Sequence, residues 1–190
     1  MYAFLIATGI VALAEVGDKT QLLAFLLAAR FRQPTPIILG ILIATLLNHF
    51  FAAGLGVWLS STIPAEWLRW ILGASFIGMA FWMLIPDEID DEVGVEKAGW
   101  GVFTTTAVAF FMAEMGDKTQ IATVALAAQA ESLIWIVAGT TLGMMIANVP
   151  AVILGDRIAE KMPTTLVHRI AAGIFLLLGL VVLSGYSGVV

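Results

Sequence analysis

Six long apolar segments account for most of this chain, and they constrain its fold more than any other feature. They cover approximately residues 2–29, 35–59, 66–86, 100–130, 133–155 and 165–188. A membrane-spanning helix needs about 20 predominantly apolar residues. Of the 190 residues, 61% are hydrophobic and only 12% are charged, whereas about a quarter of the residues in a soluble domain are charged. We therefore predict an all-α membrane protein, a single transmembrane domain over residues 1–190 with six transmembrane helices.

An eight-residue motif interrupts the first and the fourth apolar segments. It reads Ala-Glu-x-Gly-Asp-Lys-Thr-Gln and occupies residues 14–21 and 113–120, so that Glu114 follows Glu15 by 99 residues. Charge is expensive in hydrocarbon, and an intramembrane carboxylate therefore indicates a functional site. Both segments are longer than a bilayer requires. Because glycine weakens a helix, we expect a local break at Gly17 and at Gly116.

The spacing of the motif divides the chain into two repeats, residues 1–86 and 100–190, joined by an acidic linker at residues 87–99. Gly40 and Gly139 match at the same spacing, as do Gly56 and Gly155. Each repeat contains three predicted spans. Because three is an odd number, the second repeat must enter the membrane from the opposite side. The sequence thus predicts two inverted three-helix repeats, an arrangement found in many secondary transporters.

The basic residues outside the motif indicate the orientation in the membrane. The connections between spans 1–2, 3–4 and 5–6 contain Arg30, Arg32, Lys97, Arg157, Lys161 and Arg169, and the opposite side contains only Arg69. Cytoplasmic loops carry an excess of Lys and Arg, so we expect both termini to lie outside. No organelle-targeting segment is evident.

The charged residues of each motif are spaced to share one helix face, since positions three and four apart are neighbours on a helix. In an inverted repeat the two faces can meet near the bilayer centre. The predicted metal ligands are Glu15, Asp18, Gln21, Glu114, Asp117 and Gln120, with Thr20, Thr119, Lys19, Lys118, Asn48 and Asn148 as supporting residues.

Oxygen ligands of this kind suit Mg²⁺, Ca²⁺ or Mn²⁺, whereas imidazole and thiolate ligands favour zinc or copper. The chain has no cysteine and only two histidines, of which we expect His168 in a polar connection. The four carboxylates and two ammonium groups sum to a charge of −2 if all are ionised, which one divalent cation would neutralise. A cluster without a cation could instead hold protons that an arriving cation expels, which would couple cation and proton movement.

The pattern leaves alternatives open. Each motif could be an ion pair that joins helices without binding a cation. Lys19 and Lys118 could pair with the aspartates, or could occupy the site when the metal leaves. Asn48 and Asn148 could make interhelical hydrogen bonds or line a cation pathway.

The doubled motif resembles a family of small cation exchangers defined by two Glu-x-Gly-Asp-(Lys/Arg)-(Thr/Ser) sequences. This family includes Golgi calcium/manganese exchangers, chloroplast and cyanobacterial manganese transporters, and bacterial manganese exporters. The similarity covers essentially the whole chain. It implies that Glu15, Asp18, Glu114 and Asp117 bind the transported cation, with Thr20, Gln21, Thr119 and Gln120 as neighbours, and it leaves Mn²⁺ or Ca²⁺ open as the substrate.

The sequence therefore favours a secondary active transporter that exports a divalent cation, Mn²⁺ or Ca²⁺, by proton antiport. A passive cation channel is the nearest alternative, and an intramembrane enzyme or an exporter of small organic ions is less well supported. The chain lacks a P-loop and any basic patch for nucleic acid. We expect the lipid bilayer and the transported ions as partners and no resident cofactor, and a homo-oligomer is compatible with the sequence.

Overall fold

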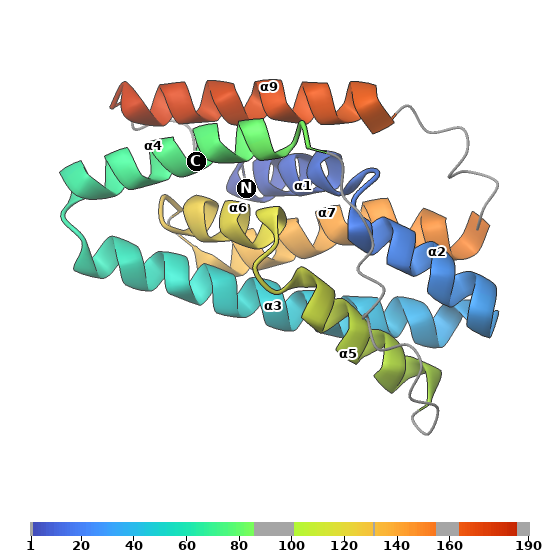
Figure 1. Cartoon of the computed structure of the whole chain (residues 1–190). Coiled ribbons are helices and arrows are strands. Elements are labelled where there is room, and N and C mark those ends of the chain that lie inside the picture. The colour runs from blue at the N-terminus through green and yellow to red at the C-terminus, as the bar shows by residue number, and fades with distance from the viewer. Residues whose placement is uncertain (1, 86–100, 131, 155–163, 186–190) are drawn as a thin grey trace.

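The computed structural model describes residues 2–85, 101–130, 132–154 and 164–185. The regular secondary structure of these residues is entirely α-helical, and most helices lie roughly along one direction, with α2 and α5 inclined to the others (Figure 1). The helices are α1 (Tyr2–Glu15), α2 (Lys19–Phe31), α3 (Pro34–Thr62), α4 (Ala65–Trp82), α5 (Val102–Glu114), α6 (Lys118–Ala127), α7 (Leu133–Leu154) and α9 (Thr164–Leu183).

The predicted spans agree with these helices in position, and the helix ends differ by a few residues. The third span was expected to continue to residue 86, but α4 ends at Trp82 and is followed by a turn; similarly, α6 ends at Ala127 and α9 at Leu183. Helices α2 and α3 instead continue beyond the predicted ends, to Phe31 and Thr62. An apolar sequence alone therefore locates helix ends only to within a few residues, since chain that is no longer helical can still be apolar and a helix can continue into polar residues. The predicted acidic linker, residues 87–99, lies outside the described residues.

The expected interruptions of the first and fourth segments are confirmed. Helix α1 ends at Glu15 and α2 begins at Lys19, and α5 ends at Glu114 and α6 begins at Lys118. At the centre of each break, glycine adopts the left-handed conformation, with φ of +82° at Gly17 and +78° at Gly116. Because only glycine takes this conformation without steric cost, the glycine of each motif allows the chain to leave one helix and start the next.

Helices from the two halves of the chain pack against each other throughout. Helix α1 packs on α7 and α3 packs on α5, while α4 packs on α9. Close approaches give the directions: Gly139 of α7 faces Phe4 of α1, and Gly143 faces Thr8 further along, so that α1 and α7 are parallel. By the same argument α3 and α5 are parallel, because Gly40 lies at Thr106 and Asn48 bonds Phe111. Helices α4 and α9 are antiparallel, with Gly73 facing Leu183 and Ile77 facing Gly179.

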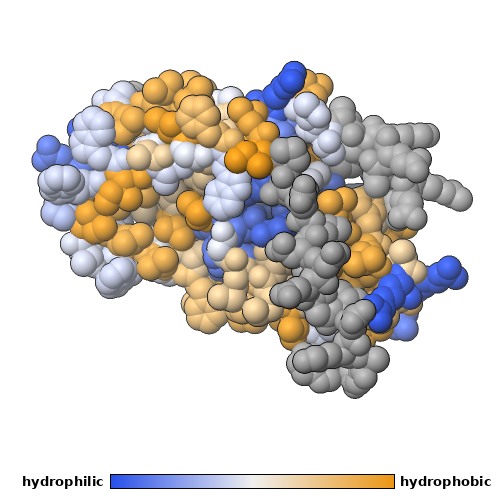
Figure 2. Space-filling view, in the orientation of Figure 1, coloured by the Kyte–Doolittle hydropathy of each residue, from blue (hydrophilic) through white to orange (hydrophobic). Residues whose placement is uncertain are grey.

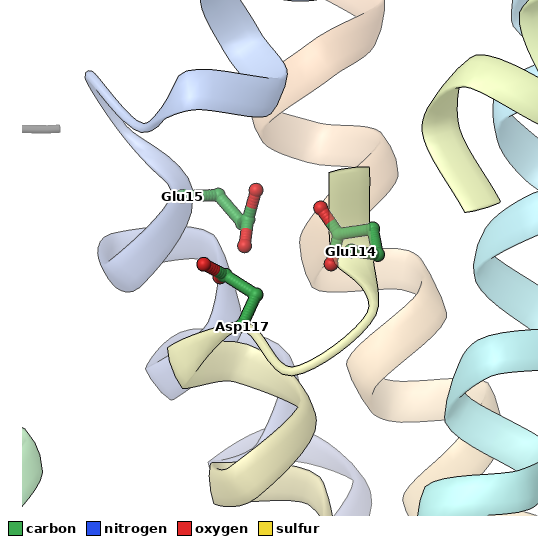
Figure 3. Close-up of side chains that lie close together, drawn as sticks. All are labelled: Glu15, Glu114 and Asp117. Atoms are coloured by element: carbon green, nitrogen blue, oxygen red, sulfur yellow. The ribbon is translucent and has the colours of Figure 1, made fainter. Parts of the chain in front are cut away.

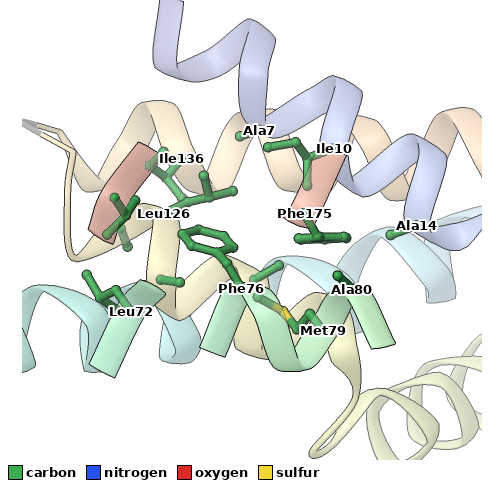
Figure 4. Packing of buried hydrophobic residues seen from close by; sticks show 14 of the residues in the cluster. Ala7, Ile10, Ala14, Leu72, Phe76, Met79, Ala80, Leu126, Ile136 and Phe175 are labelled. Atoms are coloured by element: carbon green, nitrogen blue, oxygen red, sulfur yellow. The ribbon is translucent and has the colours of Figure 1, made fainter. Parts of the chain in front are cut away.

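The interior and exterior of this bundle are both apolar. A buried cluster joins α1, α4, α6, α7 and α9 around Phe76 and Phe175, whose rings stack with centroids 6.2 Å apart (Figure 4). Large apolar side chains such as Phe50, Phe51 and Ile134 are also exposed, and apolar residues cover much of the surface in Figure 2. An exposed apolar exterior fits a lipid environment, so the protein is a multi-pass membrane protein.

Three of the described helices, α3, α7 and α9, are long and apolar enough to cross a membrane, and α1 and α5 are shorter apolar helices. The number of six spans remains a prediction at this point, because α4 is not among these three helices and the first and fourth spans would each consist of two shorter helices.

Candidate cation site

Each motif forms the same local structure around its break. Asp18 caps the N-terminus of α2 by accepting a hydrogen bond from the Thr20 backbone N–H at 3.5 Å, and Asp117 caps α6 by accepting from Thr119 at 3.4 Å. Aspartate is among the preferred residues at this position because its carboxylate satisfies a backbone donor that the helix leaves free. The aspartates thus lie at helix starts, and the prediction that Glu, Asp and Lys share one helix face is wrong, because the helix is interrupted between them.

The glutamine and threonine of each motif brace the break. The backbone N–H of Gly17 donates to Gln21 Oε1 at 2.9 Å, and that of Gly116 donates to Gln120 Oε1 at 2.8 Å. Thr20 Oγ1 donates to Glu15 Oε2 at 2.6 Å, and the corresponding bond from Thr119 to Glu114 measures 3.2 Å. The Glu, Gly, Asp, Thr and Gln of each motif therefore belong to one hydrogen-bonded unit.

The two units bring three carboxylates together. Glu15, Glu114 and Asp117 each place an oxygen within 4.8 Å of the others. Figure 3 shows Glu15 at the end of α1 pointing toward the other two, which lie on either side of the α5–α6 connection. Glu15 and Glu114 are completely buried and Asp117 is 2% exposed. One oxygen of each glutamate, Oε1, has no hydrogen-bond partner among the described residues, which leaves it available to a cation.

Two ion pairs cross between the motifs in a reciprocal way. Lys19 of the first motif lies 3.0 Å from Asp117 of the second, and Lys118 of the second lies 2.8 Å from Asp18 of the first. Lys118 and Asp18 are fully buried, whereas the Lys19 side chain is 29% exposed. Each lysine therefore neutralises the other motif's aspartate, and the fourth predicted carboxylate, Asp18, is paired with Lys118 of the second motif.

Around this cluster the amide side chains make specific contacts. Gln21 Nε2 donates to the Ala147 carbonyl of α7 at 2.9 Å, and Asn48 Nδ2 donates to the Phe111 carbonyl of α5 at 3.1 Å. Asn148 is buried and donates within its own helix to Met144. The interhelical hydrogen bond expected for a membrane asparagine is thus present at Asn48, and the bond of Asn148 stays within α7.

Sequence reasoning missed one residue at the site. We expected His168 in a connection, but it lies on α9. Its Nε2 donates to the carbonyl oxygen of Val16 in the first break at 2.7 Å. The available signal was the repeat spacing, since His168 follows Arg69, another basic residue, by 99 positions.

The arrangement presents a hard cation with buried carboxylate oxygens from two separate segments. Carboxylates are the ligands that Mn²⁺, Ca²⁺ and Mg²⁺ prefer. The same oxygens can take protons, since a buried charge must be neutralised by some partner. The geometry therefore permits competition between a cation and protons.

Comparison with known proteins agrees with this chemistry. The family model described as "Divalent cation/proton antiporter GDT1" matches residues 3–91 and 102–188. The chain is 53% identical over 171 residues to a Vibrio cholerae protein named as a candidate manganese exporter, and the alignment covers 90% of this chain and 84% of that protein. It is 27% identical over 203 residues to a GDT1-like protein of Synechocystis, covering 94% and 95% of the two chains. It is also 27% identical over 199 residues to GDT1-like protein 4 of Oryza sativa, covering 92% and 70%. No solved structure matches this chain.

Proposed function

Since the chain belongs to the GDT1 family of divalent cation/proton antiporters, we propose that it exports Mn²⁺ across a bacterial inner membrane in exchange for protons. Membership of this family makes the protein a transporter rather than an enzyme. The choice of Mn²⁺ is supported by the name of the Vibrio cholerae relative. The observation that carries the proposal is the meeting of Glu15, Glu114 and Asp117, from both motifs, inside an apolar bundle.

In this proposal the cation binds between Glu15, Glu114 and Asp117, with Asp18 completing the negative charge of the site. An arriving cation displaces protons held by these carboxylates, and protons return when the cation leaves. Lys19 and Lys118 act as internal cations that neutralise Asp117 and Asp18 between transport events, because their ammonium groups already lie against these carboxylates. This assigns both lysines a place in the exchange cycle.

Gln21 and Gln120 receive a different role from the one expected. Each side-chain oxygen accepts a hydrogen bond from the glycine of its own break, so we assign these residues to bracing the break rather than to ligating the cation. Thr20 and Thr119 hold Glu15 and Glu114 in the same way. Asn48 joins α3 to α5 beside the second motif, and Asn148 contributes a buried amide on α7.

We also propose that the chain crosses the membrane six times as two inverted repeats. The repeat spacing of 99 residues relates the starts of α2 and α6, of α3 and α7, and of α4 and α9. It also relates the two ion pairs to each other. The helix directions support the count: spans 1 and 5, and spans 2 and 4, run parallel, whereas spans 3 and 6 run antiparallel. Alternating direction from one span to the next requires this combination.

The proposed topology places both termini outside. The absence of cysteine allows single cysteines to report the side of each loop. Gln33 and Glu66 are exposed residues near opposite ends of α3. In intact cells, a membrane-impermeant maleimide should label Glu66→Cys, and it should label Gln33→Cys only after permeabilisation. The reverse labelling would contradict the orientation, and labelling of both in intact cells would contradict the crossing of α3.

The proposed activity is tested in liposomes that contain the purified protein and a pH-sensitive dye. We expect external Mn²⁺ to drive proton movement across the liposome membrane, because both ions use the same carboxylates. Parallel additions of Ca²⁺, Mg²⁺ and Zn²⁺ measure selectivity. A response to Ca²⁺ but not to Mn²⁺ would contradict the assigned substrate. Manganese uptake without proton movement, at a rate independent of a pH gradient, would instead identify a passive channel.

A further inference from the structure

The two motifs have nearly the same sequence, but their lysines differ in exposure. Of the six charged side chains in the two motifs, only that of Lys19 extends to the surface of the bundle. Its side chain is 29% exposed, whereas the four carboxylates and Lys118 are at most 2% exposed. The carboxylates are therefore enclosed in this structure, and Lys19 is the charged group of the motifs that connects them with the surface.

Both oxygens of Asp117 already have partners. Asp117 Oδ2 accepts hydrogen bonds from the Thr119 backbone N–H at 3.4 Å and from its hydroxyl at 3.5 Å, and Oδ1 lies 3.0 Å from Lys19 Nζ. A cation that binds Asp117 must therefore replace one of these partners or share an oxygen with it. Loss of the Thr119 contact would uncap α6. A shared oxygen would hold two positive charges together where the low dielectric makes their repulsion strong. The Lys19 ammonium is thus the partner that a cation replaces most readily.

Asp18 has the same two kinds of partner, but its lysine has no comparable way out. Asp18 Oδ2 caps α2 through the Thr20 backbone N–H, and Oδ1 lies 2.8 Å from Lys118 Nζ. Both side chains of this ion pair are 0% exposed, and Asp18 lies outside the group of three carboxylates. Displacement of Lys118 would leave its charge unpaired inside the bundle, which is strongly destabilising. We therefore expect this pair to persist whether or not a cation is bound.

The second motif supplies most of the carboxylates and holds them less firmly. Asp117 and Glu114 come from this motif and meet Glu15 of the first. The hydroxyl of Thr119 is shared between Glu114 at 3.2 Å and Asp117 at 3.5 Å, whereas that of Thr20 donates to Glu15 at 2.6 Å. A hydroxyl has a single proton to donate, so sharing weakens each bond. The second motif can therefore rearrange more easily around a cation.

We propose that Lys19 is the displaceable counter-ion of the site. An arriving divalent cation takes the place of the Lys19 ammonium at Asp117, and Lys19 moves toward the surface that its side chain already reaches. When the cation leaves, Lys19 returns to Asp117. Lys118 stays on Asp18 and keeps the two motifs joined throughout the cycle. Lys19 acts through Asp117 and does not contact the cation. This inference rests on the proposed exchange function, because it assigns which of the two lysines responds to the transported ion.

The reactivity of the two lysines toward acetic anhydride tests the displacement directly, because an amine held in an ion pair reacts slowly. Mass spectrometry of the purified protein measures acetylation at each lysine, in MnCl₂ and in NaCl of equal ionic strength. We expect Mn²⁺ to raise the acetylation rate of Lys19 by up to about fivefold, the effect of freeing an ion pair of ordinary surface strength. Lys118 should stay unreactive in both solutions. Mn²⁺ binding with no change at Lys19, or with equal increases at both lysines, would overturn the proposal.

Calorimetric measurement of Mn²⁺ binding separates displacement from a purely structural role of Lys19. Lys19→Gln removes the competing charge and should bind Mn²⁺ up to about fivefold more tightly than the unmodified protein. Lys19→Arg keeps the charge and should not bind more tightly. A structural role predicts weaker binding in Lys19→Gln, and that result would refute the proposal. If the unmodified protein binds no Mn²⁺, the proposed function itself is wrong. Unchanged binding in Lys19→Gln, together with Mn²⁺-driven exchange by the unmodified protein, would reject only the role of Lys19.

Discussion

We expect Asp117→Asn to reduce Mn²⁺-driven proton movement by about 100-fold, the upper end of the range for loss of a residue that supports a metal site. We expect Asp18→Asn to reduce it less severely. Asparagine caps a helix as well as aspartate does, so both variants keep the local structure of the breaks and lose only charge. Asp117 is the more sensitive position because its oxygen lies within 4.8 Å of those of Glu15 and Glu114, whereas Asp18 is not part of this group of three and pairs with Lys118. The dye-loaded liposomes measure both rates.

The matched control for these variants is Glu66→Gln, which removes one negative charge from an exposed residue in the first turn of α4. It should retain the rate of the unmodified protein. Unchanged exchange in both aspartate variants would rule out a shared cation site, and equal loss in Glu66→Gln would show that the assay responds to overall charge rather than to the cluster.

We expect Lys118→Met to destabilise the fold by about 3–5 kcal/mol, the usual cost of removing one partner from a buried ion pair, and Lys19→Met to have a clearly smaller effect. Methionine keeps the length of the side chain and removes its charge. Lys118 and its partner Asp18 are both fully buried, so the loss of this ammonium leaves a carboxylate that water does not reach. Lys19 is 29% exposed, and water therefore compensates for the loss of its ammonium group beside Asp117.

Thermal unfolding in detergent compares the two lysine variants at equal protein concentration. The double variant Lys118→Met with Asp18→Asn removes both charges and should recover much of the lost stability, since the uncompensated carboxylate is then absent. Equal destabilisation by the two single variants would contradict the difference in burial. Failure of the double variant to recover stability would show that Lys118 acts through packing rather than charge.

Much of the helical framework follows from residue types. Long apolar runs predict the helix positions, and the glycine between two acidic residues predicts the two breaks, because glycine is the residue that adopts the left-handed conformation seen at Gly17 and Gly116. Helix ends are less predictable: α4 stops at Trp82 although the apolar sequence continues to residue 85. Apolar character reports burial in lipid or protein, and it does not report where the backbone leaves the helix.

The residues of the candidate site could largely be predicted from the sequence, but the hydrogen bonds between them could not. The sequence predicted carboxylates from both motifs in one place, and the structure brings Glu15, Glu114 and Asp117 together. It did not predict that Gln21 braces its own break or that His168 reaches Val16. The bond of Gln21 exists because the helix unwinds, and the contact of His168 joins segments 152 residues apart. If the motif is treated as one regular helix, as in the sequence analysis, neither the unwound turn nor a contact with a distant segment can be predicted.

The sequence by itself determined the duplicated acidic unit and its local shape, since two identical motifs make the same caps and the same glycine turns wherever the chain places them. Only the tertiary structure decided that Lys19 pairs with Asp117 and Lys118 with Asp18, and that His168 of α9 contacts the first break. The physical reason is that hydrogen bonds within a motif span at most a few residues. The ion pairs and the contact of His168 depend instead on the relative positions of packed helices.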